Sequence, residues 1–111
     1  MNCNRSPIMN SKKFDPPNSS LHYFSKLLKE GSWVSIFDET ERLLIEYPNS
    51  PYLMGMKADA SLKIGKIEGA IEGYKALLKL DPFRYDIYFN LGIIEEQKDN
   101  LDKALFYFEQ A

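Results

Sequence analysis

The sequence predicts an all-α fold, a right-handed solenoid of about six helices arranged as helix–turn–helix pairs. Turn-forming residues lie 34 residues apart at Gly31, Gly65 and Asp99, and Pro48 and Pro82 show the same spacing. Between these positions, apolar residues recur at intervals of three and four, the period of an amphipathic helix. A repeat of this length is typical of solenoids, in which each helix pair packs only on its neighbours.

The first helix pair is predicted from its capping residues. Asn18 is a good residue to precede a helix, and Gly31 ends the helix because glycine adopts a left-handed turn at low cost. Ser32 is then expected to cap a second helix that begins at Trp33, and Pro48 to stop it. The predicted boundaries therefore enclose two helices of similar length.

The second pair shows the clearest start signal. Ser50 is expected to cap the third helix, and Pro51 suits the first helical position, where its missing N–H costs nothing. Gly65 turns the chain into the fourth helix. That helix carries Ala70 and Tyr74, a small residue followed by a ring one turn later, which favours close approach of two helices with the ring beside the contact.

The third pair repeats this pattern most fully. Leu91 and Gly92 lie in its first helix, Ala104 and Phe108 in its second, and Asp99 in the turn. Together with the matching frame upstream, these residues resemble the tetratricopeptide repeat (TPR) family over residues 18–111. The repeats fall at about 17–50, 51–84 and 85–111, with the last one truncated. Residues 1–17 are polar and rich in proline, and we expect a flexible N-terminal arm there.

Several positions depart from the family pattern. Ile36 replaces a small residue and Thr40 a ring in the first repeat, which we interpret as an N-terminal cap because terminal repeats are often atypical. Lys57 and Ser61 depart in the second repeat. Glu95 stands where an aromatic is usual in the third, and we expect it to solvate the helix surface.

Composition argues against several functional classes. The formal net charge is −2, whereas a nucleic-acid binder of this size would usually be basic. One cysteine, Cys3, and one histidine, His22, cannot form a disulfide framework or a structural zinc site. No apolar run is long enough to span a membrane. We therefore expect no catalytic residues, no metal and no cofactor, and a cytoplasmic protein, with the nucleus as the alternative.

The resemblance implies a non-catalytic scaffold that binds a partner peptide or helix in a concave groove. Asn90 is the most informative position, because an asparagine before the Leu-Gly pair recurs in peptide-holding members and its amide can both donate and accept. The resemblance places eight candidate residues towards this groove: Leu28, Asp59, Leu62, Lys63, Phe89, Asn90, Ile93 and Gln97.

The last predicted helix suggests a second interface. In a stack, one face of each repeat is buried by the next one, and the aromatic-rich end of this sequence has no polar capping helix after it. Two explanations remain open: the chain is the N-terminal part of a longer solenoid, or this face stacks on another protein or another copy, giving a homo-oligomer. The candidate stacking residues are Leu105, Phe106 and Phe108.

Two alternatives to the groove-binding scaffold remain open at this stage. The chain could be a structural subunit of a larger assembly, since the Asp-Pro-Phe-Arg stretch ending at Arg84 faintly resembles the Asp-Pro-Tyr-Arg of a scaffold subunit of the anaphase-promoting complex. It could also be the recruiting region of a longer enzyme.

Overall fold

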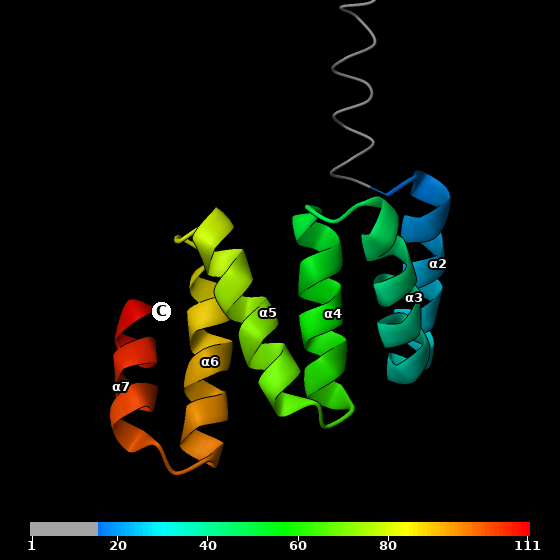
Figure 1. Ribbon diagram of the computed structural model, residues 1–111. Coiled ribbons are helices and arrows are strands. Elements are labelled where there is room, and N and C mark those ends of the chain that lie inside the picture. Colours follow the sequence, from blue (N-terminus) through cyan, green and yellow to red (C-terminus); the bar gives the residue numbers. More distant parts are fainter. Residues whose placement is uncertain (1–15) are drawn as a thin grey trace, which may run out of the picture.

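The computed structural model of the protein describes residues 16–111, and the predicted arm lies, up to residue 15, outside the described residues. The described part contains six helices and no strand. Each helix runs antiparallel to the one before it, as Figure 1 shows. The helices are α2 (Asn18–Glu30), α3 (Trp33–Glu46), α4 (Pro51–Lys63), α5 (Ile67–Leu80), α6 (Tyr85–Gln97) and α7 (Leu101–Gln110).

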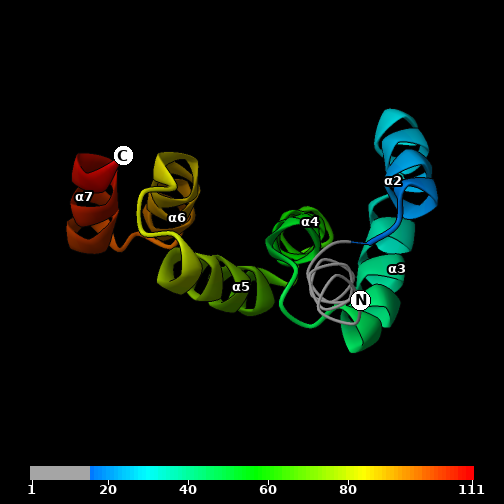
Figure 2. The same cartoon turned by 90° about the horizontal axis from the view of Figure 1, so that it is seen from above.

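The helices form an elongated row of three pairs, with overall extents of 55 × 31 × 20 Å. Seen from above, the row curves, and α2, α4 and α6 lie along its inner side (Figure 2). The predicted all-α repeat fold is thereby confirmed. Its order in space follows its order in sequence, so each helix contacts mainly its sequence neighbours.

The turns within the pairs have the left-handed conformation that the sequence predicted. Gly31 has φ 68°, Gly65 has φ 89° and Asp99 has φ 62°. Asp99 is the one residue of the three with a side chain, and aspartate tolerates this conformation better than most residues. A change to a β-branched residue at any of the three would strain the turn.

Most helix starts agree with the prediction, but two caps do not. The first helix, α2, begins at Asn18 itself after Pro17, so Asn18 does not precede the helix as expected. The Ser50 hydroxyl accepts a hydrogen bond from the backbone N–H of Leu53 at 3.3 Å, and Pro51 is the first residue of α4. Ser32 precedes α3, yet its side chain makes no capping hydrogen bond, so the predicted side-chain cap is wrong there. Backbone hydrogen bonds from Ser32 and Trp33 close that turn instead.

Two apolar clusters form the core, and α4 contributes to both. Leu53, Met56 and Ala60 of α4 belong to the first cluster, with residues of α2 and α3. Ala58 belongs to the second, with residues of α5 and α6. A helix that buries two faces is held on both sides, so α4 joins the first repeat to the rest of the row.

Candidate functional site

The predicted groove residues come from α2, α4 and α6, the three helices along the inner side of the row (Figure 2). Phe89 is 51% exposed, an unusual state for a phenylalanine. Asn90 and Ile93 are half-buried, whereas Asp59 and Gln97 are exposed. This side therefore presents apolar and polar side chains together.

A polar contact joins α4 and α5 on this side. The Tyr74 hydroxyl donates a hydrogen bond of 2.6 Å to Oδ1 of Asp59. Burial first, and then this hydrogen bond, raise the pKa of Tyr74 far above its ordinary value, and the neighbouring Asn90 side chain offsets part of that rise. The structure thus joins one predicted groove residue, Asp59, to the hydroxyl of a buried tyrosine.

Arg84 extends this polar area. Its guanidinium donates two hydrogen bonds to the Asp86 carboxylate, at 3.0 and 2.9 Å. The hydrogen bond from Arg84 lowers the pKa of Asp86. The same bond is the main cause of the raised pKa of Arg84, to which the charge of Asp59 adds a minor part. A shallow hollow of about 240 Å³ lies here, lined by Pro51, Tyr52, Gly55, Met56, Asp59 and Arg84.

Three predicted groove residues lie outside this polar area. Leu28 is exposed near the end of α2. Leu62 packs against the second apolar cluster. The Lys63 ammonium lies 5.7 Å from the centre of the Trp33 ring, at the start of α3. The polar centre of the groove side is therefore the hydrogen bond between Tyr74 and Asp59, not an even line of residues along the groove.

The predicted stacking face on α7 divides into two parts. Leu105 and Phe106 are 59% and 56% exposed. Phe108 is half-buried, with its ring 5.8 Å from that of Phe89 in a tilted arrangement. A Cβ added at Gly92 would lie 2.6 Å from the Phe108 ring, so this glycine makes room for it. Phe108 accordingly links the stacking face to the groove side.

Two polar roles were not foreseen from the sequence. Glu95 was expected to solvate the surface, which is wrong: it is buried and accepts a hydrogen bond of 2.8 Å from the Asn100 amide. Tyr74 was expected only as a packing ring, yet its hydroxyl is the centre of the polar contact. The departure of Glu95 from the family pattern was the one signal available for the first role.

The part of the chain that the structure describes shows neither a group of metal ligands nor a membrane-spanning helix. Between residues 16 and 111, no three His, Cys, Asp or Glu side chains are grouped so that they could hold a metal ion. None of the six helices has the length and apolar character needed to cross a membrane.

A curved row of helix pairs with a mixed apolar and polar inner side defines a helical-repeat protein. The family model for the TPR repeat matches residues 58–99. A TPR repeat-containing protein of Methanocaldococcus jannaschii is 30% identical over 99 residues, which cover 84% of this chain. The chain belongs to the tetratricopeptide repeat family, and TPR repeats generally mediate protein–protein interactions.

The chain spans 17% of the length of that relative. The match therefore concerns the repeats and not the activity of the whole archaeal protein. Neither comparison bears on the faint resemblance of the stretch around Arg84 to a scaffold subunit of the anaphase-promoting complex, which stays a prediction.

Proposed function

We propose that this chain is a non-catalytic interaction scaffold that holds an extended or helical segment of a partner protein along α2, α4 and α6. The observations that carry this proposal are the exposed Phe89 ring, which precedes Asn90 on α6, and the hydrogen bond between Tyr74 and Asp59. An exposed aromatic next to fixed polar groups supports peptide binding, because the ring supplies apolar area and the polar groups set the register. The cytoplasm, or the nucleus, is the proposed site of action.

The test is to select peptides against the full chain from a displayed random library and to measure their affinity by calorimetry. The double variant Phe89→Ala with Asn90→Ala should weaken binding about 10- to 100-fold. Val34→Ala and Ile45→Ala are matched controls, because both residues are exposed and lie on α3. Thermal unfolding of every variant separates lost binding from lost folding. Peptides that bind the double variant as tightly as the wild type would refute the proposal.

A second function is favoured by the exposed apolar stripe of α7. Leu101 is exposed one turn before Leu105, so the two share a helix face with more apolar area than an isolated surface residue provides. We propose that this face stacks on another helical surface, and a second copy of the chain is the partner that can be tested directly. Light scattering over a concentration series should show a dimer that Leu105→Glu abolishes and the exposed-site control Ile45→Glu does not. A monomer at every concentration would argue against self-association.

A further inference from the structure

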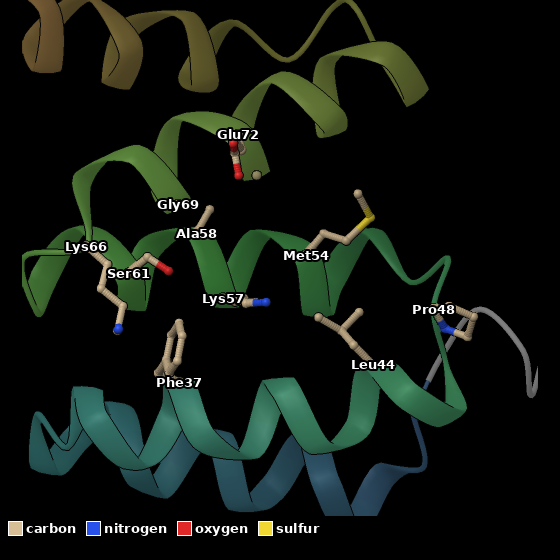
Figure 3. A pocket seen from close by; sticks show the side chains of 11 residues that line it. Phe37, Leu44, Pro48, Met54, Lys57, Ala58, Ser61, Lys66, Gly69 and Glu72 are labelled. Atoms are coloured by element: carbon tan, nitrogen blue, oxygen red, sulfur yellow. The ribbon is translucent and has the colours of Figure 1, made fainter.

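A crevice lies between α3, α4 and α5, away from the predicted groove residues. It has a volume of about 460 Å³. Figure 3 shows it from close by, with Phe37 and Leu44 reaching up from α3 and Glu72 facing them from α5. None of the eight predicted groove residues lines it. The lining residues are Phe37, Leu44, Pro48, Met54, Lys57, Ala58, Ser61, Lys66, Gly69, Glu72 and Gly73.

The crevice exists because of residues that are small or charged where the helices meet. Lys57 and Ser61 of α4 stand 34 residues before Leu91 and Glu95, at the same positions of the repeat. Leu91 is fully buried, whereas Lys57 is half-buried and holds its ammonium over the Phe37 ring. On the α5 side, Gly69 has no side chain, and a Cβ added there would be 3.9 Å from the Ser61 hydroxyl. These small or charged residues of the second repeat therefore contribute to the space between the helices.

The two ends of the crevice differ in chemistry. At one end, two ammonium groups flank the same ring: Lys57 lies 5.7 Å and Lys66 5.4 Å from the centre of Phe37. At the other end Leu44, Met54 and Pro48 form an apolar surface, as Figure 3 shows. Lys57 also pairs with Glu41 at 3.5 Å, whereas no ion pair joins Lys66 to an acid among the described residues.

We propose that this crevice is a second binding site, for a segment of a partner protein that carries an apolar side chain followed by an acidic one. The apolar side chain would enter the end formed by Leu44 and Met54. The carboxylate would lie between the two lysines beside Phe37, where it relieves the repulsion of two like charges held near one ring. Glu72 on the opposite wall disfavours acidic residues in the middle of the segment.

The length of the segment follows from helix geometry. Phe37 and Leu44 are seven residues apart on α3, which corresponds to about 10 Å along the helix axis. Three to four extended residues span about this distance. A suitable probe is therefore the tetrapeptide acetyl-Leu-Gly-Ser-Glu-amide, with three matched probes in which Leu becomes Ser, Glu becomes Gln, or Glu becomes Lys.

The experiment is a titration of the isotope-labelled full chain at low salt, followed by amide chemical shifts. We expect shifts at Ala58, Ser61, Gly69 and Gly73, with a Kd of about 1 mM. Replacing Leu in the probe should weaken binding about 10-fold, and replacing Glu by Gln about 3-fold. The Lys-bearing probe should bind most weakly, because the lysine end repels it.

Variants of the chain give the decisive comparison. Lys66→Gln should weaken binding about 3-fold and Glu72→Gln strengthen it about 2-fold, so the two charge removals act in opposite directions. Ser61→Tyr, which fills the crevice, should abolish binding. Lys75→Gln removes an exposed lysine of α5 that does not line the crevice and should have no effect. The double variant Phe89→Ala with Asn90→Ala should also bind the probe normally, which keeps this site distinct from the groove.

Several results would overturn the proposal. The proposal of an acidic partner would be refuted if no crevice amide shifted at about 10 mM probe. It would also be refuted if the acidic and the Lys-bearing probe bound with equal affinity. Two other possible occupants of the crevice can be detected without any probe. Crevice shifts that change with protein concentration would identify a second copy of the chain. Crevice shifts caused by Ile8→Ser or Phe14→Ser would identify the N-terminal residues as the occupant.

Discussion

Lys57 and Leu91 occupy the same position in consecutive repeats, but the packing around them differs. Leu91 is fully buried in the cluster that also holds Ile87 and Tyr74. Lys57 lies over Phe37 and pairs with Glu41, and a crevice remains between α3, α4 and α5. The two positions share the repeat spacing, so the packing at each junction depends on its side chains together with the separation of its helices.

A second pair of equivalent positions, four residues further along each repeat, shows the same difference in packing. Ser61 and Glu95 are both buried, although an aromatic is usual there in the family. The Glu95 carboxylate fills its place and is held by Asn100, whereas the Ser61 hydroxyl leaves space up to Gly69. The second repeat therefore has the more open packing at both positions, which favours a binding role for its crevice in addition to the proposed groove site on α6.

Exchanging the residue types at positions 57 and 91 should give the largest effect on stability. Leu91→Lys places an ammonium in an apolar cluster and should lower the free energy of unfolding by about 4 kcal/mol. Lys57→Leu should raise it by about 1 kcal/mol, because the added apolar area is buried against Phe37 and Leu44 while only a surface ion pair is lost. Urea unfolding of both variants measures the difference, and equal changes in the two would show that the junctions are packed alike.

Two glycine-to-alanine variants sharpen the comparison further. A Cβ at Gly92 would lie 2.6 Å from the Phe108 ring, so Gly92→Ala should lower the free energy of unfolding by about 2 kcal/mol. A Cβ at Gly69 meets nothing closer than 3.9 Å, so Gly69→Ala should stabilise by about 0.5–1 kcal/mol through the better helix propensity of alanine. The thermal midpoint should therefore move in opposite directions. A gain in stability from Gly92→Ala would contradict the close contact.

The contrast also explains what the sequence could predict. The turns at Gly31 and Gly65 and the start of α4 at Pro51 depend on local backbone preferences, and these predictions were correct. The crevice could not be predicted, because its volume depends on the separation of three helices. The departure of Lys57 from the repeat pattern marked the place without giving its shape.

The candidate site likewise depends on helix packing that the sequence does not reveal. Asp59 and Tyr74 are 15 residues apart on different helices, and their hydrogen bond depends on how α4 and α5 cross. The sequence named Asp59 and Asn90 separately as groove residues, through the family resemblance. It gave no sign that a tyrosine hydroxyl bonds to Asp59, because periodicity locates a ring in the core but says nothing about the polar atom at its edge.

Replacing that hydroxyl should give the smallest effect of the three, but a distinctive one. Tyr74→Phe removes one hydrogen bond, so the free energy of unfolding should fall by about 1 kcal/mol near pH 7. Tyr74 is 2% exposed, and its pKa in the folded chain lies above its ordinary value of 10.0. The stabilisation from a raised pKa is fully present below pH 10 and is lost as the pH rises, since the unfolded chain ionises first.

The wild type should therefore lose its advantage over Tyr74→Phe in alkaline solution. One proton changes stability by at most about 1.4 kcal/mol per pH unit, so the difference should vanish between about pH 10.5 and 11. Urea unfolding of both proteins from pH 7 to pH 11 measures it. Asp59→Asn is the matched variant, because it removes the carboxylate that helps to raise the pKa of Tyr74. The alkaline loss of stability caused by this tyrosine should therefore be complete at a lower pH than in the wild type. A difference between wild type and Tyr74→Phe that stays constant up to pH 11 would show that folding does not change the ionisation of this tyrosine.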